Sequence, residues 1–250
     1  MGFLDKYIAD FEPISLKEMD SVELMKRIDT KFILNRNILQ KIFPLLTDHY
    51  KLLYVNGIVK SQYTSLYFDT DDFIFFLNHH NGRLNRSKVR FREYIDSKVC
   101  FLEVKRKNSK GKTIKKRIKV EKALKTLNAN QKNFIKSRLK KDYTLHYCHK
   151  NFFRRITMVN KFLKERITID FDLEFRNDKE AITNKTNYIV VAEVKQEKLD
   201  RNSFFYKLMK ENGIRPSSMS KYCIGTSLLN EDLKANRFKK NFRILKKNNN

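Results

Sequence analysis

The sequence predicts an α+β fold built on an antiparallel β-barrel of about eight strands, with a charged lumen and flanking helices. Three observations support this fold class. The 250 residues are 41% hydrophobic, which is enough to bury a sizeable core. From residue 60 onward, polar and apolar residues alternate with the period of two that is typical of strands. Within these strands the polar face consists mainly of Lys and Arg.

The elements follow from this periodicity and from the capping residues. The first forty-odd residues are expected to be helical, with Asn37 as the cap of a helix that carries Ile38, Leu39, Ile42 and Phe43. Strands are expected over 60–69, 72–79, 87–95, 98–107 and 113–120. Residues 121–141 are predicted to be helical, and strands resume over 151–159, 163–175 and 187–196. A short helix is expected over 203–211, with Gly213 ending it.

The domain organisation is predicted to be simple. No linker rich in Pro, Gly or Ser divides the chain, so residues 1–226 are expected to form one domain, followed by a basic tail over 227–250. The stretch from Lys234 to Asn250 holds seven cations and no acidic residue. Two interpretations of this stretch stay open, a solvated chain end and a docking site for a polyanion or an acidic lipid surface.

Charge and cysteine content restrict the class of protein. Lys and Arg number 54 against 28 Asp and Glu, a formal net charge of +26, which predicts an anionic partner. The sequence contains no apolar stretch long enough for a transmembrane helix and no secretory signal pattern at its start. The three cysteines form no Cys-x-x-Cys pair, which favours a reducing compartment. We therefore expect a cytoplasmic protein.

The strands place their charges on one face. Lys88, Arg90 and Arg92 share a face, and Val89 and Phe91 lie on the other. Four further strands repeat this arrangement, with polar faces formed by Glu103 and Lys105, by Lys115, Arg117 and Lys119, by Arg166, Thr168, Asp170 and Asp172, and by Glu193 and Lys195. An ordinary sheet with one solvated face is the alternative.

A solvated face usually mixes both signs of charge, whereas these faces are dominated by cations, so we favour a lumen. Like charges about 4 Å apart repel by about 4 kcal/mol at an effective dielectric constant near 20. A lumen of this kind therefore implies a bound polyanion, often with a metal ion held by the carboxylates.

At this point the motifs resemble a known family. They are Arg27-x-Asp29-Thr30-Lys31-Phe32, Tyr67-Phe68-Asp69-Thr70, Lys88 to Tyr94, Phe101 to Lys105, Phe152-Phe153-Arg154, Arg166 to Asp170, Glu193-Val194-Lys195 and Ser220-Lys221-Tyr222. Together they span about residues 22–226 and resemble, in order, the polyphosphate polymerase (VTC) domain. This domain is a CYTH-like branch of the triphosphate tunnel metalloenzymes.

The resemblance implies a fold, a reaction and a set of site residues. It implies a β-barrel tunnel that binds a nucleoside triphosphate, with ATP expected, together with Mn²⁺ or Mg²⁺. The γ-phosphoryl group would pass to a growing polyphosphate chain. By position, the catalytic cations are Lys31, Arg90, Arg92, Lys105 and Arg166, and the phosphate-binding ones are Lys88, Arg117, Arg154, Lys195 and Lys221. Glu193 corresponds to the metal-binding carboxylate, with Glu103 as its helper. No specific nucleic-acid partner is expected, and a membrane-associated partner is not readable from the sequence.

The sequence departs from the family at several positions. Phe32 and Phe152 stand where the family often has Tyr, so the corresponding hydroxyl contacts are in doubt. The hydrolytic relatives open with Glu-x-Glu-x-Lys, and Arg27 replaces the first of these carboxylates, which favours the polymerase branch. Two alternatives remain open, a tunnel-type triphosphatase and a non-catalytic module that binds polyphosphate or another polyanion.

Overall fold

The computed structural model describes residues 2, 4–21, 27–177, 183–186, 188–239 and 242–243. Within these residues, eleven strands join in one sheet. The strands are β1 Pro13–Ser15, β2 Ile28–Asn35, β3 Tyr50–Tyr54, β4 Ser61–Asp69, β5 Arg86–Tyr94, β6 Val99–Lys107, β7 Thr113–Val120, β8 His146–Asn160, β9 Glu165–Arg176, β10 Thr183–Thr186 and β11 Ile189–Gln196. The helices are α1 Asp5–Ile8, α2 Leu16–Ser21, α3 Arg36–Ile42, α4 Ile74–His80, α5 Ala129–Leu139, α6 Phe204–Glu211 and α7 Lys221–Leu228, with 3₁₀ turns η1 Pro44–Leu46 and η2 Asn236–Phe238.

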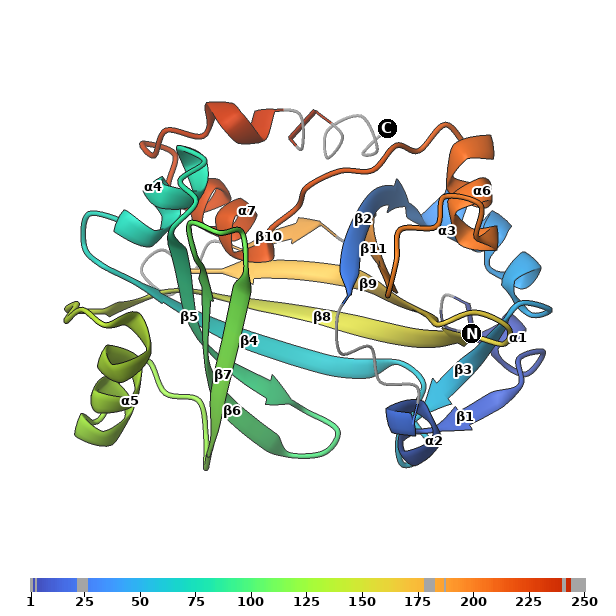
Figure 1. Cartoon of the computed structure of the whole chain (residues 1–250), viewed down its shortest axis with the longest axis horizontal. Helices are drawn as coiled ribbons and strands as arrows, with labels where there is room; N and C mark the ends of the chain where they lie inside the picture. The colour runs from blue at the N-terminus through green and yellow to red at the C-terminus, as the bar shows by residue number, and fades with distance from the viewer. Residues whose placement is uncertain are drawn as a thin grey trace.

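The main path of the sheet runs β2-β11-β9-β8-β4-β5-β6-β7, and every neighbouring pair on it is antiparallel. The short β1 is the exception, because it pairs with β3 in parallel. Strands β5 to β7 cross the long strands β8 and β9 at a steep angle, so the sheet curls on itself (Figure 1). The predicted α+β class, with an antiparallel sheet flanked by helices, is confirmed.

The sheet does not close into a complete barrel. Strands β2 and β7 lie at the two ends of the path, and no pairing joins them in the described part of the chain. The outer edge of β2 is taken by a coil segment instead, since the Ser217 amide donates to the Lys31 carbonyl at 2.8 Å. Strand β7, with Lys115 and Arg117, keeps its outer edge free of any described strand.

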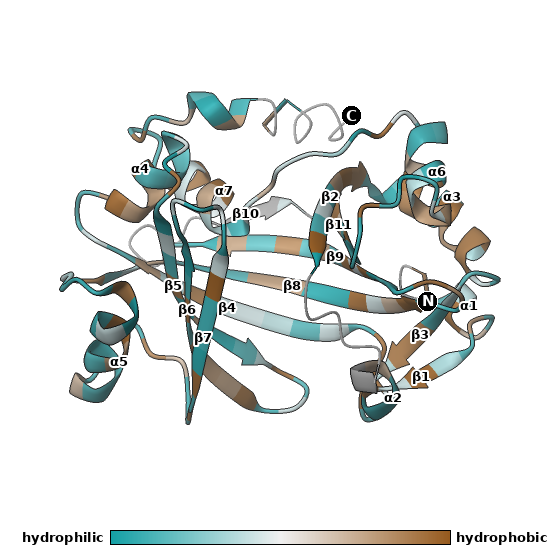
Figure 2. Cartoon of the chain, in the orientation of Figure 1, coloured by the Kyte–Doolittle hydropathy of each residue, from teal (hydrophilic) through white to brown (hydrophobic). Residues whose placement is uncertain are grey.

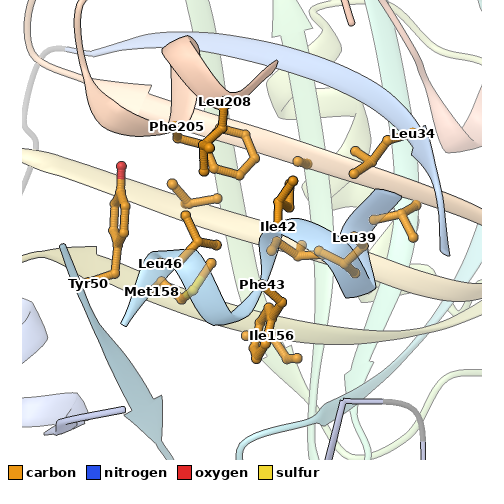
Figure 3. Packing of buried hydrophobic residues seen from close by; sticks show 14 of the residues in the cluster. Leu34, Leu39, Ile42, Phe43, Leu46, Tyr50, Ile156, Met158, Phe205 and Leu208 are labelled. Carbon is orange, nitrogen blue, oxygen red and sulfur yellow. The ribbon is translucent and has the colours of Figure 1, made fainter. Parts of the chain in front are cut away.

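Helices α3 and α6 cover the apolar outer face of the sheet. Their side chains pack with those of β2, β3 and β8 in a cluster that includes Leu34, Leu39, Ile42, Phe43, Leu46, Tyr50, Ile156, Met158, Phe205 and Leu208 (Figure 3). Helices α4 and α5 cover the outer face of β4 to β6 in the same way, with Phe75, Phe76 and Ile135 against Phe68, Phe91 and Leu102. Burial of these apolar faces stabilises the sheet and leaves the polar face turned inward.

Helix α7 packs on the inner face and fills one end of the curled sheet. Its Ile224 joins a buried apolar cluster with Ile33, Phe153, Leu173, Phe175, Val191 and Met219. Leu173 reaches this side because Asp172 has a φ of 52° and the β8–β9 register shifts there, as in a β-bulge. The bulge therefore changes the inner face of β9 from charged to apolar where α7 lies.

Several predicted elements are wrong. Residues 72–79 are not a strand, because α4 begins at Ile74. The Asp69 carboxylate holds the first turn of α4 by accepting from the Phe75 and Phe76 amides at 2.9 and 3.0 Å. The first forty residues are not uniformly helical, because they contain β1 and β2. The cap of α3 is Asn35, which accepts from the Ile38 amide at 2.8 Å, rather than Asn37.

Other predictions hold in part. The helix predicted over 203–211 is confirmed as α6, whereas only 129–139 of the predicted helical stretch 121–141 is α-helical. In the described part of the tail, Phe238 packs against the rings of Phe76 and His80. Helix α7 runs to Leu228, past the expected boundary at 226, and the division into a domain and a tail stays a prediction. Among the described residues, no helix combines the length and apolar character that crossing a bilayer requires.

We predict that Gly225→Ala destabilises the protein, although alanine normally favours a helix by about 1 kcal/mol over glycine. A Cβ at position 225 would lie 2.5 Å from His149 Nε2 and 2.6 Å from Phe175 Cδ1. Overpacking of this kind costs about 1–3 kcal/mol. A thermal melt should show a fall of several degrees, and an unchanged or raised melting temperature would contradict the packing of α7 against β8 and β9.

Candidate functional site

The inner face of the curled sheet encloses a cavity of about 840 Å³. The eight strands of the main path and the segment 219–222 supply most of its walls. The described lining contains twelve Lys and Arg side chains against five Asp and Glu. The size is that of a small-molecule site, and the charge excess indicates an anionic ligand.

The predicted strand parity is confirmed on β5. Lys88, Arg90 and Arg92 line the cavity, whereas Val89 and Phe91 are fully buried beneath the outer helices. Of the twelve site residues predicted from the sequence, the structure brings eleven to the cavity wall: Lys31, Lys88, Arg90, Arg92, Glu103, Lys105, Arg117, Arg166, Glu193, Lys195 and Lys221. Their functions as catalytic, phosphate-binding or metal-binding groups stay predictions.

Arg154 does not line the cavity. Its side chain is 46% exposed, and its Nε lies 3.7 Å from Asp172 Oδ2. The neighbouring Arg155 takes the inward position. It lies on the same face of β8 as Phe153 and Thr157, which also point inward. The motif comparison selected Arg154 because an arginine is expected at that place in the motif. Residues two apart in a strand share a face, so an inward Phe153 identifies Arg155 as the inward arginine instead.

Two carboxylates of the cavity each lie between two cations. Glu193 on β11 contacts Lys31 from β2 and Lys195 from its own strand. Asp170 on β9 accepts two hydrogen bonds from Arg155, at 2.6 and 2.8 Å, and also contacts Lys221. Bidentate contacts of this kind fix a guanidinium in one orientation.

Glu103 is the third such carboxylate. Arg90 donates to its Oε2 from Nε and Nη2 at 2.9 and 2.6 Å, and Lys115 lies 2.5 Å from its Oε1. Burial by itself would raise the pKa of Glu103, but Arg90, Arg92 and Lys115 together lower it to about 2. Glu103 is therefore ionised and positions Arg90.

Sequence reasoning missed several cavity residues. Asp29, Tyr67, Lys115, Arg155 and Asp170 all line the cavity but were not predicted as site residues. Tyr67 accepts from Arg90 Nη1 at 3.1 Å, and the nearby cations lower the pKa of its hydroxyl even though burial opposes this. The alternation within each strand could have revealed Asp29, Lys115 and Asp170, because they share a strand face with Lys31, Arg117 and Arg166. Tyr67 lies on β4, a strand with no predicted site residue.

Other cations have no carboxylate in contact. Arg92 is 8% exposed, its Nε has no partner among the described residues, and burial and Arg90 lower its pKa to about 10. Its guanidinium lies 5.6 Å from the ring of Tyr63. Lys88 donates to Ser220 Oγ at 2.7 Å, a contact that leaves its charge uncompensated. These positive charges are the natural contacts for an anionic ligand.

Comparison with known proteins places this geometry in a family. The sequence model of the VTC domain matches residues 26–230. The chain belongs to the VTC domain family. No curated protein matches the sequence.

Three solved structures are similar to this VTC domain at low sequence identity. A putative adenylyl cyclase from Hippeastrum, described as having a dominant triphosphatase activity, has a TM-score of 0.49 and 14% identity, over 80% of this chain and 94% of its own. A putative adenylate cyclase from Bacillus halodurans has a TM-score of 0.46 and 12% identity, over 78% and 94%. One from Vibrio parahaemolyticus has a TM-score of 0.44 and 10% identity, over 81% and 99%.

The carboxylates of this VTC domain limit how a divalent metal could be held. In the described part of the chain, no group of three or more His, Cys, Asp or Glu side chains is placed to bind an ion. Glu193 fits a site in which one carboxylate binds Mg²⁺ or Mn²⁺ and phosphate oxygens of the substrate supply further ligands. Both carboxylates contact a cation through each oxygen, but the Glu103 side chain is only 2% exposed against 17% for Glu193, so Glu103 fits less well.

We predict that triphosphate binding takes up protons above pH 8. The Lys105 side chain is exposed to the cavity. Partial loss of water around its ammonium group and the charge of the neighbouring Lys88 lower its pKa to about 8. Phosphate oxygens favour its charged form, so binding raises this pKa and the ammonium group takes up a proton. Calorimetric titration at about pH 8.5, in two buffers of different ionisation enthalpy, measures the uptake.

The test variant for this prediction is Lys105→Gln, and the control is Lys132→Gln. Lys132 lies on the exposed side of α5. Lys105→Gln should reduce the uptake, and Lys132→Gln should leave it unchanged. In the ligand-free protein the pKa of Lys105 lies below its unfolded value, so its contribution to stability should grow as the pH rises through about 8. Equal uptake in all three proteins would contradict the role of Lys105.

Proposed function

We propose that this VTC domain is a metal-dependent polyphosphate polymerase, which transfers the γ-phosphoryl group of a nucleoside triphosphate to a growing polyphosphate chain. ATP is the nucleotide we expect. The observation that supports this function is the cavity itself, in which cations outnumber carboxylates by twelve to five. The three free cysteines agree with a cytoplasmic location, which we also propose.

The cavity residues divide into two groups under this proposal. Lys88, Arg92 and Lys105, which have no carboxylate in contact, bind phosphate oxygens directly. The second group is held by carboxylates. Arg90, Arg155 and Lys221 form a rigid charged frame with Glu103 and Asp170, and Lys31 and Lys195 contact Glu193 until phosphate oxygens compete for them. Arg117 on β7 and Arg166 on β9 complete the wall.

Phosphoryl transfer suits such a frame. The transition state spreads negative charge over the transferred group, and catalysis depends on positioning and electrostatic stabilisation rather than on a covalent protein intermediate. The ion pairs of Glu103 and Asp170 fix the guanidinium groups of Arg90 and Arg155 before substrate binds. Little reorganisation of these groups is then required during the reaction.

A divalent metal ion would bind at Glu193, and when bound it would neutralise charge on the phosphate oxygens and orient the triphosphate. Mn²⁺ and Mg²⁺ both prefer such oxygen ligands. The side chain of Glu193 is 17% exposed and faces the cavity between Lys31 and Lys195. Phosphate oxygens compete for both lysines, and the carboxylate becomes available as they do so.

A triphosphatase is the second candidate, and the carboxylates make it less favourable. Hydrolysis needs a group that removes a proton from water, whereas the end of a polyphosphate chain is already an anionic nucleophile. Glu103 and Asp170 have pKa values lowered by neighbouring cations that outweigh the effect of burial, so both are poor bases. The cavity is therefore better suited to a phosphate acceptor than to water.

One incubation tests the proposal against its alternatives. The purified protein is mixed with ATP and Mn²⁺, and the products are separated on a gel that resolves polyphosphate. Long chains sensitive to phosphatase are the expected result. Orthophosphate alone would support the triphosphatase, and absence of turnover would support a polyanion-binding module.

We predict that Arg92→Gln lowers kcat/KM about a hundredfold or more, which corresponds to roughly 3 kcal/mol of transition-state stabilisation. Arg92 has no carboxylate in contact, so its removal should leave the melting temperature unchanged or raise it. Arg138 lies on the exposed side of α5 and outside the cavity lining, so Arg138→Gln is the matched control. Equal losses in the two variants would show that general positive charge, not an inward register, is responsible.

We predict that Glu193→Gln abolishes metal-dependent turnover but preserves binding of triphosphate without metal. The substitution keeps the shape of the side chain and removes a carboxylate that repels phosphate. Isothermal titration in the presence of a chelator should show equal or tighter binding. Loss of binding together with a lower melting temperature would make Glu193 a structural partner of Lys31 and Lys195.

A further inference from the structure

A run of positive charge continues from the cavity onto the outside of the molecule. Residues 105–119, at the end of β6, in the following turn and along β7, contain nine Lys and Arg and no Asp or Glu. We call this segment the β6–β7 strip. Its strands carry long hydrophilic stretches at the free end of the sheet (Figure 2).

Most charges of the β6–β7 strip are uncompensated. Lys115 contacts Glu103, and none of the other eight cations has a carboxylate within 4.0 Å among the described residues. Most of these side chains are exposed, including Lys110, Lys112, Lys116 and Lys119. Uncompensated cations this close together repel one another, so the strip favours a ligand that carries many negative charges.

The strip is continuous with the cavity. Lys105, Lys115 and Arg117 belong to the strip and also line the cavity wall. In the described structure no strand pairs with the outer edge of β7. The cavity side of β7 is therefore continuous, around this edge, with its exposed side. A chain that leaves the cavity past Lys115 would therefore meet the exposed cations of the same strand.

The residue types of the strip favour a phosphate chain over a nucleic acid. Residues 105–119 contain no aromatic side chain, whereas binding of single-stranded nucleic acid relies on aromatic rings that stack with bases. Phe101, the nearest ring on the cavity side of β6, is covered by the Arg117 guanidinium at 4.3 Å. Lysines and arginines spaced along an extended strand can bind phosphate oxygens without any base contact.

We propose that the β6–β7 strip is a binding site for the polyphosphate chain outside the cavity, where it holds the part of the product that extends beyond the reacting end. The proposal rests on the proposed function for the identity of the chain. The strip lengthens the contact of the protein with a long polymer, and it adds nothing to the binding of a short triphosphate inside the cavity. Long chains are therefore retained in preference to short ones.

The test is a binding experiment on three full-length proteins. The strip variant is Lys112→Gln/Lys116→Gln/Lys119→Gln, which changes no residue of the cavity lining. The matched control is Lys132→Gln/Lys207→Gln/Lys210→Gln, which removes the same charge from exposed positions on α5 and α6. The probes are polyphosphate of roughly one hundred units, inorganic triphosphate and single-stranded RNA of equal charge, without metal or nucleotide and at several salt concentrations.

The strip variant should bind long polyphosphate at least about tenfold more weakly than the unchanged protein, with a shallower dependence on salt. Its affinity for triphosphate should stay within about twofold, and the control should match the unchanged protein for both probes. Equal loss in the control, or no loss in the strip variant, would overturn the proposal. RNA that binds as tightly as polyphosphate and is lost in parallel would overturn it in favour of a nucleic-acid surface.

These outcomes are independent of the proposed function. Binding is measured without turnover, so a protein that retains long chains through the strip but makes none would refute the polymerase and leave the strip. Conversely, a protein that polymerises while the strip variant binds long chains normally would refute the strip alone.

Discussion

The structure depends on holding many positive charges together inside a curled sheet. Twelve Lys and Arg side chains line one cavity, and their mutual repulsion opposes folding of the ligand-free protein. Three carboxylates, Glu103, Asp170 and Glu193, reduce this repulsion because each contacts two cations, from its own strand or from neighbouring segments. The cations beyond these pairs are the ones that a phosphate ligand would neutralise.

The outer face, the end filled by α7 and the free edge of β7 each bear differently on the repulsion between the cavity cations. Helices α3 and α6 bury one part of the apolar outer face (Figure 3), and α4 and α5 bury another. This burial compensates the cost of the charged interior. Helix α7 fills one end of the curl with apolar side chains, and Gly225 permits its close approach. The free edge of β7 leaves the charged surface continuous with the exterior.

The pattern of charge is encoded locally in the amino-acid sequence. The period of two in β5, β6, β7, β9 and β11 involves only neighbouring residues, and a strand geometrically separates its even from its odd residues. For that reason the alternation alone groups Lys88, Arg90 and Arg92 on one face, and their excess of charge predicts that this face is the inward one. The α+β class, the covering helices and the family followed from the same pattern and from the order of its motifs.

Features that depend on residues far apart in the sequence arise only in the folded chain. Strand β2 formed because it pairs with β11, more than 150 residues later, and the Asp69 carboxylate that caps the first turn of α4 is also held by the hydroxyl of Tyr222 from α7. The bulge at Asp172 depends on strand register, which residue type does not encode. The open edge of the sheet has the same origin. To close the barrel, β7 would have to pair with the outer edge of β2, and the backbone of Ser217 already bonds to that edge at Lys31.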